Sequence, residues 1–341
     1  MDCRRRTAAA SLLAVFAMGA FVATGTTANA SPWEVDWVKH AENPLIIPDG
    51  ENQVGAPCVL SDGGVYRMWL NGQYDIKYSE SGDGVSWPAP EVNLQTDTFA
   101  FWEPSVIKDL DAVPDERYKM WYRAHTGGGH PGDSVIEYAT SPDGFGWTKH
   151  DEVIGSGTGE IYDYVVAPSV VKNDSGDYEM WYTAVQGGVG QVAYATSSDG
   201  ILWDQGEGQV FGPDGTGFDS DGVNAAGMFV EDGIHYLLYM GWDGMNYELG
   251  MAWSDDGIHD WTRKDLPLLE LGAPGDFDDA GTGYGAAAGA SMLFKDNQYW
   301  LYYTGYSSSG ELSIGLATGI PEPASLSLLA LGGLLLTRRR R

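Results

Sequence analysis

The sequence predicts an all-β protein built from one repeated unit, and three observations predict it. An aromatic-rich phrase occurs five times, with 52 to 63 residues between successive copies, beginning at Tyr66, Tyr118, Tyr178, Tyr236 and Tyr299. The first four copies are followed by Asp-Gly and then Trp, as in Asp143, Gly144 and Trp147. No unit shows the 3.6-residue apolar period of a helix. A fixed period of this length and content is typical of a β-propeller, here with five blades.

The third unit illustrates the four strands that we expect in each blade. Its predicted elements are a strand at 169–172, a turn at 173–177, strands at 178–184 and 191–196, and a fourth strand from Trp203. The tight Asp-Gly signal between the third and fourth strands favours a hairpin. We therefore expect the Asp-Gly aspartates to shape hairpins and the following tryptophans to wedge between blades; these aspartates are Asp83, Asp143, Asp199 and Asp256.

The fifth unit stops after its third strand, and the missing fourth strand is predicted at the other end of the chain. The tetrapeptide that begins at Trp37 matches the one that begins at Trp147, which is a predicted fourth-strand start. Residues 33–48 are therefore expected to complete the last blade. Such closure removes an exposed sheet edge. The predicted propeller spans residues 31–319 and leaves no room for a second domain.

The two ends of the chain predict export and sorting. Residues 1–30 contain three arginines, an apolar stretch at 8–23 that predicts a signal helix, and the small-residue site Ala28-Asn29-Ala30, which together indicate a signal peptide. Residues 320–341 contain Pro321-Glu322-Pro323, a short apolar stretch that predicts a helix, and four terminal arginines. An alternative for this tail is a plain membrane anchor, because the arginines also suit a cytoplasmic flank.

The body between the predicted termini is strongly acidic. Residues 31–320 contain 12 Lys and Arg against 46 Asp and Glu, a net charge of −34. This charge argues against nucleic acid and anionic membranes as partners, because phosphate contacts need a basic face. Cys58 is the one cysteine outside the predicted signal peptide, so we expect it to be buried packing and not a disulfide. We expect a monomer.

The candidate site follows from propeller geometry. The residues before each first strand and the loops after each second strand converge on one central funnel, which is the default site of such a fold. Of the slots before the first strands, only the one at Glu103 carries a charge. The candidate catalytic residues are Glu103, Asp163 and Asp219, and the candidate substrate-binding residues are Trp102, Asp75, Arg123, His125, Trp242 and Asp243. Aromatic faces with carboxylates favour sugar binding and acid–base chemistry.

Each candidate also has a purely structural interpretation. Asp163, Asp219 and Asp278 recur once per blade, so they could simply hold the loop that enters the first strand. Glu103 breaks the repeat, and polarity that breaks a symmetric pattern favours function. We expect no cofactor and no metal site, although the acidic cluster at 276–279 could hold calcium despite lacking the spacing of a known calcium loop.

Several phrases in the body resemble the five-bladed glycosidase-like propellers, which include arabinanases, invertases and mannoside phosphorylases. These phrases are Asn43-Pro44-Leu45-Ile46-Ile47-Pro48, Tyr-x-Met-Trp-Tyr and the stretch from Ala139 to Trp147. The resemblance implies a general base in blade one and a general acid in blade four. The matching slots here are Ala56 and either Ala225 or Ala226, which argues against the usual hydrolysis. The tail at 320–341 resembles a PEP-CTERM sorting signal.

Two functions of different classes follow from these resemblances. The first is an exported protein that binds or processes glycans in its central funnel, as a glycoside hydrolase or phosphorylase if it is active. The alternative is a non-catalytic glycan-binding or structural propeller associated with exopolysaccharide. The PEP-CTERM resemblance implies processing by signal peptidase and exosortase. It also implies transient anchoring in the inner membrane before release to the cell surface or extracellular matrix.

Overall fold

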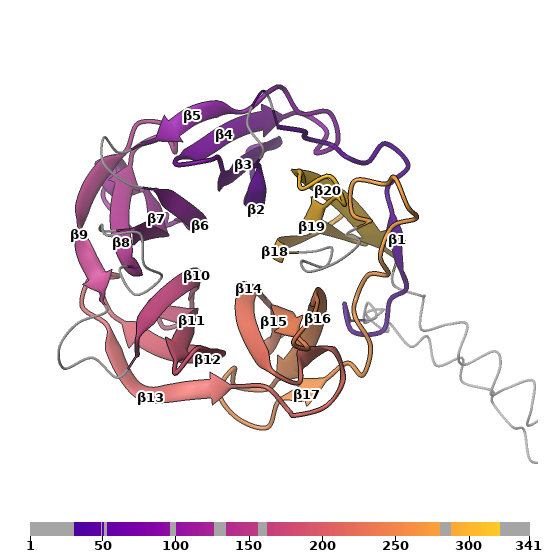
Figure 1. Cartoon of the computed structure of the whole chain (residues 1–341). Coiled ribbons are helices and arrows are strands. Elements are labelled where there is room, and N and C mark those ends of the chain that lie inside the picture. Colours follow the sequence, from indigo (N-terminus) through magenta and orange to yellow (C-terminus); the bar gives the residue numbers. More distant parts are fainter. Residues whose placement is uncertain are drawn as a thin grey trace, which may run out of the picture. The chain divides into compact units, whose positions relative to one another are not determined.

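The computed structural model describes residues 31–48, 50, 53–95, 100–125, 134–155, 162–279 and 288–320. These residues form five four-stranded antiparallel sheets arranged around a central axis (Figure 1). The predicted all-β five-bladed propeller is therefore confirmed. The predicted signal helix and C-terminal helix lie outside the described residues. Within the part of the chain that is described, no helix has the length and apolar character needed to cross a membrane.

The strands follow the chain blade by blade, from the axis outwards. Blade 1 contains β2 (Gly55–Asp62), β3 (Val65–Asn71), β4 (Ile76–Ser81) and β5 (Glu91–Leu94). Blade 2 contains β6 (Phe101–Lys108), β7 (Tyr118–His125), β8 (Ser134–Ser141) and β9 (Thr148–Ile154). Blade 3 contains β10 (Tyr164–Lys172), β11 (Tyr178–Gln186), β12 (Val189–Ser197) and β13 (Asp204–Phe211). Blade 4 contains β14 (Gly222–Glu231), β15 (Ile234–Trp242), β16 (Tyr247–Ser254) and β17 (Thr262–Arg263).

Blade 5 is closed by the two ends of the described chain. It contains β18 (Ala288–Lys295), β19 (Gln298–Tyr306), β20 (Leu312–Gly319) and, outermost, β1 (Trp37–Lys39). Strand β1 pairs antiparallel with β20, with Trp37 opposite Gly319 and Lys39 opposite Ala317. A further bridge joins Ile46 to Ile314. The expected closure by the N-terminal strand is confirmed.

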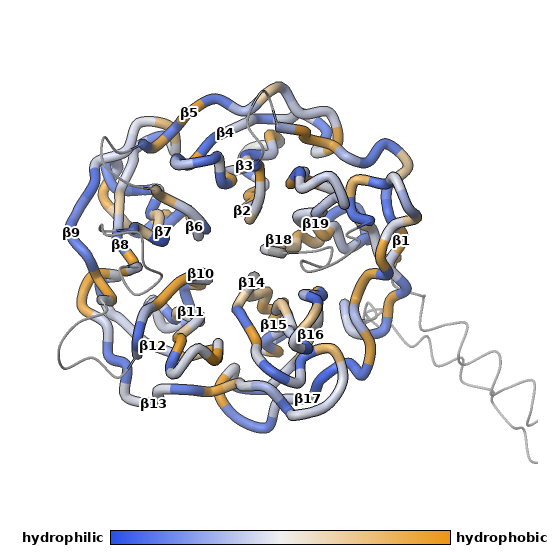
Figure 2. Tube along the Cα trace, in the orientation of Figure 1, coloured by the Kyte–Doolittle hydropathy of each residue, from blue (hydrophilic) through white to orange (hydrophobic). Residues whose placement is uncertain are grey.

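Burial and hydropathy differ between the inner strands of each blade and the strands at the rim of the propeller. The first strand of each blade, such as β2 or β10, lies innermost (Figure 1). The rim strand β9 is largely hydrophilic, and its first five residues are exposed (Figure 2). The second strands are the most buried, because each is covered by both neighbouring blades. Trp69, Trp121 and Trp181 on these strands have no exposed surface.

Aromatic side chains on the second strands join each of four blades to the next. Each donates a hydrogen bond to a glycine carbonyl in the hairpin of the following blade. The pairs are Trp69 Nε1 to Gly144 at 2.9 Å, Trp121 Nε1 to Gly200 at 2.8 Å, Trp181 Nε1 to Gly257 at 2.7 Å and Tyr302 Oη to Gly84 at 2.8 Å. In these four blades the repeated aromatic phrase therefore supplies the donor, and the repeated Asp-Gly supplies the acceptor, of one hydrogen bond between neighbouring blades.

The Asp-Gly hairpins are shaped by their aspartates. Asp143 Oδ1 accepts hydrogen bonds from the N–H groups of Phe145 and Gly146, and it also accepts one from the Ser141 hydroxyl. The Gly146 N–H is the main reason that the pKa of Asp143 lies below its usual value, because it stabilises the charged carboxylate. The glycine after each aspartate has a left-handed backbone, with φ of 82° at Gly144.

Candidate functional site

A cavity of about 150 Å³ lies on the propeller axis, among the innermost strands. We call it the axial cavity. Residues of all five blades line it. Its polar lining residues are Asn71, Glu103, Asn224 and Thr304, and its apolar ones include Pro57, Pro104, Pro168 and Met240. Among the described lining residues, Glu103 alone carries an ionisable side chain.

Hydrogen bonds between blades surround the axial cavity. In four of the first strands, one residue donates its N–H to the preceding blade, and this residue has a left-handed backbone at Ala56, Glu103 and Ala167. At three junctions the acceptor is a side chain from the second strand of the preceding blade. The pairs are Ala56 N–H to Thr304 Oγ1 at 2.9 Å, Glu103 N–H to Asn71 Oδ1 at 2.5 Å and Ala225 N–H to Thr183 Oγ1 at 2.8 Å.

Glu103 supplies the acceptor at the junction between blades 2 and 3. The second-strand position that holds Asn71 in blade 1 holds Arg123 in blade 2, and a guanidinium cannot accept a hydrogen bond. Glu103 Oε2 instead accepts from Ala167 N–H at 2.7 Å. Glu103 Oε1 lies 3.6 Å from Arg123 Nη1. Glu103 and Arg123 both depart from the sequence repeat. The Glu103 carboxylate supplies the hydrogen-bond acceptor that Arg123 cannot supply.

Arg123 gathers three of the predicted residues into one cluster. Its Nε donates to Ser134 Oγ at 3.0 Å, and its guanidinium carbon lies 4.9 Å from the centre of the Trp102 ring. The His125 ring centre lies 6.5 Å from that of Trp102. Glu103, Trp102, Arg123 and His125 are thus brought together. The guanidinium covers one face of Trp102, so that face is not open to a sugar ring.

Asp163 lies in the loop that enters β10, close to blade 3 and not among the cavity lining. Its Oδ2 accepts a hydrogen bond from Gly187 N–H at 2.7 Å, and its own N–H donates to the Val185 carbonyl at 2.8 Å. These two bonds tie the loop to the end of β11.

Asp219 is buried inside blade 4, away from the axial cavity. Its Oδ2 accepts hydrogen bonds from Tyr239 Oη at 3.0 Å and from Arg263 Nη1 at 2.5 Å. Asp278 has the equivalent place in blade 5, where it binds Tyr303 Oη at 2.9 Å and Lys39 Nζ at 2.6 Å. Both aspartates connect a second-strand tyrosine to a cation on the outermost strand.

The remaining predicted residues are Asp75 and Asp243, which lie in turns of blades 1 and 4, and Trp242, which ends β15; none of them lines the axial cavity. Asp75 is in the turn between β3 and β4, where its carbonyl accepts from Gly72 N–H at 2.8 Å. Asp243 Oδ1 accepts from the N–H groups of two residues of its own turn. Trp242 packs on Tyr247, with 4.5 Å between ring centres. The turn that holds Asp75 contacts the cluster through Trp102, whose Nε1 donates to the Gln73 carbonyl at 3.2 Å.

The acidic cluster at 276–279 is occupied by hydrogen bonds within the protein. Asp276 Oδ2 accepts from Ala273 N–H at 2.8 Å, and Asp279 accepts from Gly275 N–H and from Ser308. In the part of the chain that is described, no group of three or more His, Cys, Asp or Glu side chains is placed to hold a metal ion.

Sequence reasoning missed the uncharged polar lining of the axial cavity, namely Asn71, Asn224 and Thr304. Asn71 and Thr304 look like ordinary strand positions, because their partners lie in another blade, as far away in sequence as Thr304 is from Ala56. A signal was nevertheless present. The second-strand position holds Asn71, Thr183 and Thr304 in three blades, and a polar residue at one fixed repeat position indicates a shared contact.

The described lining of the axial cavity contains a single carboxylate, that of Glu103. The usual glycosidase mechanisms need two carboxyl groups about 5–10 Å apart. The described lining of the axial cavity offers one carboxylate, and this carboxylate already accepts from Ala167 N–H beside Arg123.

Comparison with known sequences shows similarity over part of the chain. No family model matches it. Two uncharacterized proteins of Mycobacterium tuberculosis are each 35% identical over 182 residues, which cover 51% of this chain and 58% of each relative. The chain therefore spans a little over half the length of the curated relatives that it matches.

Solved structures share the fold over most of the chain. A glycosyl hydrolase from Bacteroides ovatus is 20% identical, with a TM-score of 0.65 over 84% of this chain and 96% of that one. An endo-1,4-β-xylanase from Bacteroides thetaiotaomicron is 17% identical, with a TM-score of 0.62 over 79% and 91%. A structure from the GH130 family of mannoside phosphorylases is 18% identical, with a TM-score of 0.62 over 86% and 95%. At these identities the similarity shows the five-bladed propeller fold alone.

Proposed function

We propose that this protein binds a glycan at its axial cavity and does not cleave it. The observation that carries the proposal is the lining of that cavity, where Glu103 is the one carboxylate among the described residues and is held by Ala167 N–H and Arg123. The fold shared with glycoside hydrolases supports a sugar as the ligand. The alanines in the two slots that carry acids in such enzymes support the loss of catalysis.

The decisive experiment measures sugar release and sugar binding by the same purified protein. Polysaccharides and aryl glycosides are offered with and without phosphate, because phosphate can replace a missing carboxylate in phosphorolysis. We expect no release, together with binding on a glycan array. Release that is lost in Glu103→Ala but retained in an Asp219→Asn variant would overturn the proposal and make the protein an enzyme.

Glu103→Gln is the matched variant for the binding measurement. Its amide oxygen can still accept from Ala167 N–H, so the junction between blades 2 and 3 keeps its hydrogen bond. Glu103→Ala loses the acceptor as well as the charge. We expect Glu103→Gln to weaken glycan binding less than Glu103→Ala, because only the second variant loses the hydrogen-bond acceptor on this side of the cavity.

We also propose that the propeller acts at the cell surface or in the extracellular matrix. Support comes from the signal-peptide pattern at 1–30 and from the PEP-CTERM resemblance at 320–341. Signal peptidase and exosortase would then be the processing partners. The test is the location of a chain that lacks residues 321–341. Unchanged arrival at the cell surface would contradict exosortase sorting.

A further inference from the structure

A second cavity, of about 370 Å³, lies among the same five first strands. We call it the second cavity. Pro57, Pro104 and Pro168 line both this cavity and the axial cavity, and the residues that follow these prolines in β2, β6 and β10 line the second cavity alone. Because the first strands surround the propeller axis (Figure 1), the two cavities lie end to end along it. Small-molecule sites usually have volumes above about 300 Å³, and the second cavity meets that size.

The wall of the second cavity is largely aliphatic. Blades 1, 2, 3 and 5 each contribute a half-buried aliphatic side chain from one repeat position, and blade 4 contributes a half-buried methionine. These residues are Leu60, Ile107, Val171, Leu293 and Met228. No aromatic side chain is found in the described lining, so it offers no ring face to a sugar. Displacement of water from such a wall by an apolar ligand is favourable.

Three serine hydroxyls give this wall its uncharged polar side chains. Ser105, Ser169 and Ser291 occupy one repeat position, opposite an aromatic residue of the second strand. Each accepts a hydrogen bond from an N–H of the next blade, at 2.9, 2.8 and 3.0 Å. A hydroxyl can donate a hydrogen bond as well as accept one. Among the described residues no group accepts from these three hydroxyls, so they can donate to a ligand oxygen.

The charged residues of the described lining are Lys108 and Lys172, which end β6 and β10 on the side away from the prolines. Lys108 Nζ lies 2.6 Å from Asp62 Oδ1, and Lys172 Nζ lies 2.7 Å from Asp109 Oδ1 and 2.9 Å from Asp111 Oδ2. The carboxylates balance the ammonium groups, so this end of the cavity has no excess positive charge for an anion. A cation would meet two ammonium groups.

We propose that the second cavity binds an uncharged aliphatic chain that ends in an oxygen, as in a primary alcohol or an ester. The chain lies against Leu60, Val171 and Leu293, and its oxygen accepts from the serine hydroxyls. The strongly acidic body of the protein also repels anionic amphiphiles. The inference goes beyond the proposed function, because it concerns another cavity and another class of ligand.

Calorimetric titration compares octanol with octanoate and octylammonium, which have the same chain length and a charged end. We expect octanol to bind the wild-type protein at least about tenfold more tightly than either charged analogue, because a charge that enters the cavity loses water without gaining a free partner. Equal or tighter binding of a charged analogue, or no binding of octanol, would overturn the proposal.

Val171→Thr is the matched variant, because it keeps the shape of the side chain and exchanges a methyl group in the wall for a hydroxyl. We expect it to bind octanol about three- to tenfold more weakly than the wild-type protein does, the size expected for one lost apolar contact. Val38→Thr makes the same exchange at an exposed position on the rim strand β1 and should bind as the wild type does. Equal affinity of the two variants would overturn the placement of the chain.

Backbone amide shifts of the ¹⁵N-labelled protein locate the ligand. We expect octanol to shift the amides of Ser169 and Ser291 and to leave those of Glu103 and Asn224, which line the axial cavity, unchanged. The reverse pattern would place octanol in the axial cavity and overturn the inference. A glycan that binds as proposed above should shift Glu103 and not Ser169, so either ligand can fail while the other stands.

Discussion

The junction between blades 2 and 3 and the junction between blades 4 and 5 are held together by different forces. The first has three kinds of hydrogen bond: Trp121 to the Gly200 carbonyl, Ala167 N–H to Glu103, and Val170 N–H to Ser105 Oγ. At the second, Leu238 holds the position of Trp121, Gly227 holds that of Ser105, and Met240 holds that of Arg123. No described residue of blade 4 makes the corresponding bonds. A side-chain hydrogen bond described at this junction joins Tyr299 of blade 5 to Glu231 of blade 4.

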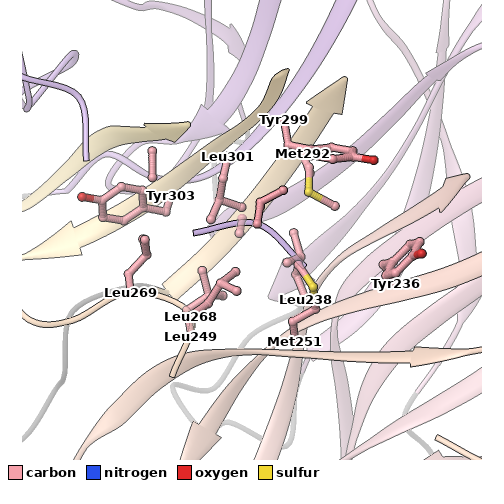
Figure 3. Close-up of a cluster of buried hydrophobic side chains, with 13 residues drawn as sticks. Tyr236, Leu238, Leu249, Met251, Leu268, Leu269, Met292, Tyr299, Leu301 and Tyr303 are labelled. Carbon is pink, nitrogen blue, oxygen red and sulfur yellow. The ribbon is translucent and has the colours of Figure 1, made fainter. Parts of the chain in front are cut away.

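Apolar packing replaces hydrogen bonds between blades 4 and 5. Buried residues of β15, β16, β18 and β19 form one cluster with two leucines that follow β17, as Figure 3 shows; the labelled residues include Leu238, Leu249, Leu268, Leu269, Met292 and Leu301. The first strands also approach closely, since a Cβ on Gly227 would lie 2.4 Å from the Ala290 carbonyl oxygen. Hydrogen bonds fix geometry, whereas apolar contact tolerates adjustment.

The difference has a physical origin in the way the ring closes. The acceptor for each second-strand aromatic is a glycine in the hairpin between the third and fourth strands of the next blade. Blade 5 has no such hairpin, because its third strand ends at Gly319 and its fourth begins at Trp37. A tryptophan in blade 4 would find no carbonyl there, and Leu238 fills the space instead. The comparison teaches that closure by the two chain ends removes one contact from the repeat.

The largest effect is expected from a cavity in the apolar junction. Leu238→Ala should lower the free energy of unfolding by about 2–5 kcal/mol, because Leu238 is 1% exposed and its removal leaves an unfilled space. Urea unfolding measures the change, with the exposed Leu202→Ala as control. A loss as small as that of the control would show that the apolar cluster does not hold blades 4 and 5 together.

The second-largest expected effect distinguishes the packing of the tryptophan rings from their hydrogen bonds at the other junctions between blades. Trp121→Phe should lower the free energy of unfolding by about 1–3 kcal/mol more than Trp300→Phe, because it leaves the Gly200 carbonyl without its donor. Trp300 is the matched control, since its buried Nε1 has no partner among the described residues. Equal losses in thermal or urea unfolding would mean that the tryptophan hydrogen bonds contribute nothing beyond packing.

A double variant tests the compensation between Glu103 and Arg123. Glu103→Ala should lower the free energy of unfolding by about 1 kcal/mol, because Ala167 N–H loses its acceptor. Adding Arg123→Thr should restore part of the loss, since threonine at this repeat position accepts from the next blade in blades 3 and 5. A double-mutant cycle measures the coupling. If the stability losses of Glu103→Ala and Arg123→Thr simply add in the double variant, a threonine at position 123 does not replace Glu103 as the acceptor, and the proposed compensation is refuted.

The smallest expected effect is a change of folding stability with pH, to which the Asp-Gly hairpins of three blades contribute. Backbone N–H groups are the leading cause that holds the pKa values of Asp83, Asp143 and Asp199 below the unfolded value of about 3.9. A lowered folded pKa adds stability above the unfolded value, and this stability is lost as pH falls through the folded pKa. Asp143→Asn should therefore cost about 0.5 kcal/mol or less at pH 7, and less at pH 2. Parallel pH profiles would contradict this assignment.

The repeat made the fold predictable, whereas the site was predictable only in part. Each unit carries both an aromatic donor such as Trp69 and a hairpin glycine such as Gly144, so every blade can contact the next one in the same way. The match between the sequences at Trp37 and Trp147 identified the strand that closes the ring. Glu103 stood out because it breaks the repeat. Asn71 and Thr304 did not, because each accepts a hydrogen bond from the N–H of a residue in another blade.

The pairing of β1 with β20 also determines when the propeller can be completed. Trp37 meets Gly319, so the first strand of the described chain must wait for almost the last one to be synthesised. Until then blade 5 has an open edge, and open strand edges are where chains pair with the wrong partner. Contacts between residues so distant in sequence also form slowly. A chain truncated before Leu312 would therefore have four complete blades but no β20 for β1 to pair with, so the propeller could not close.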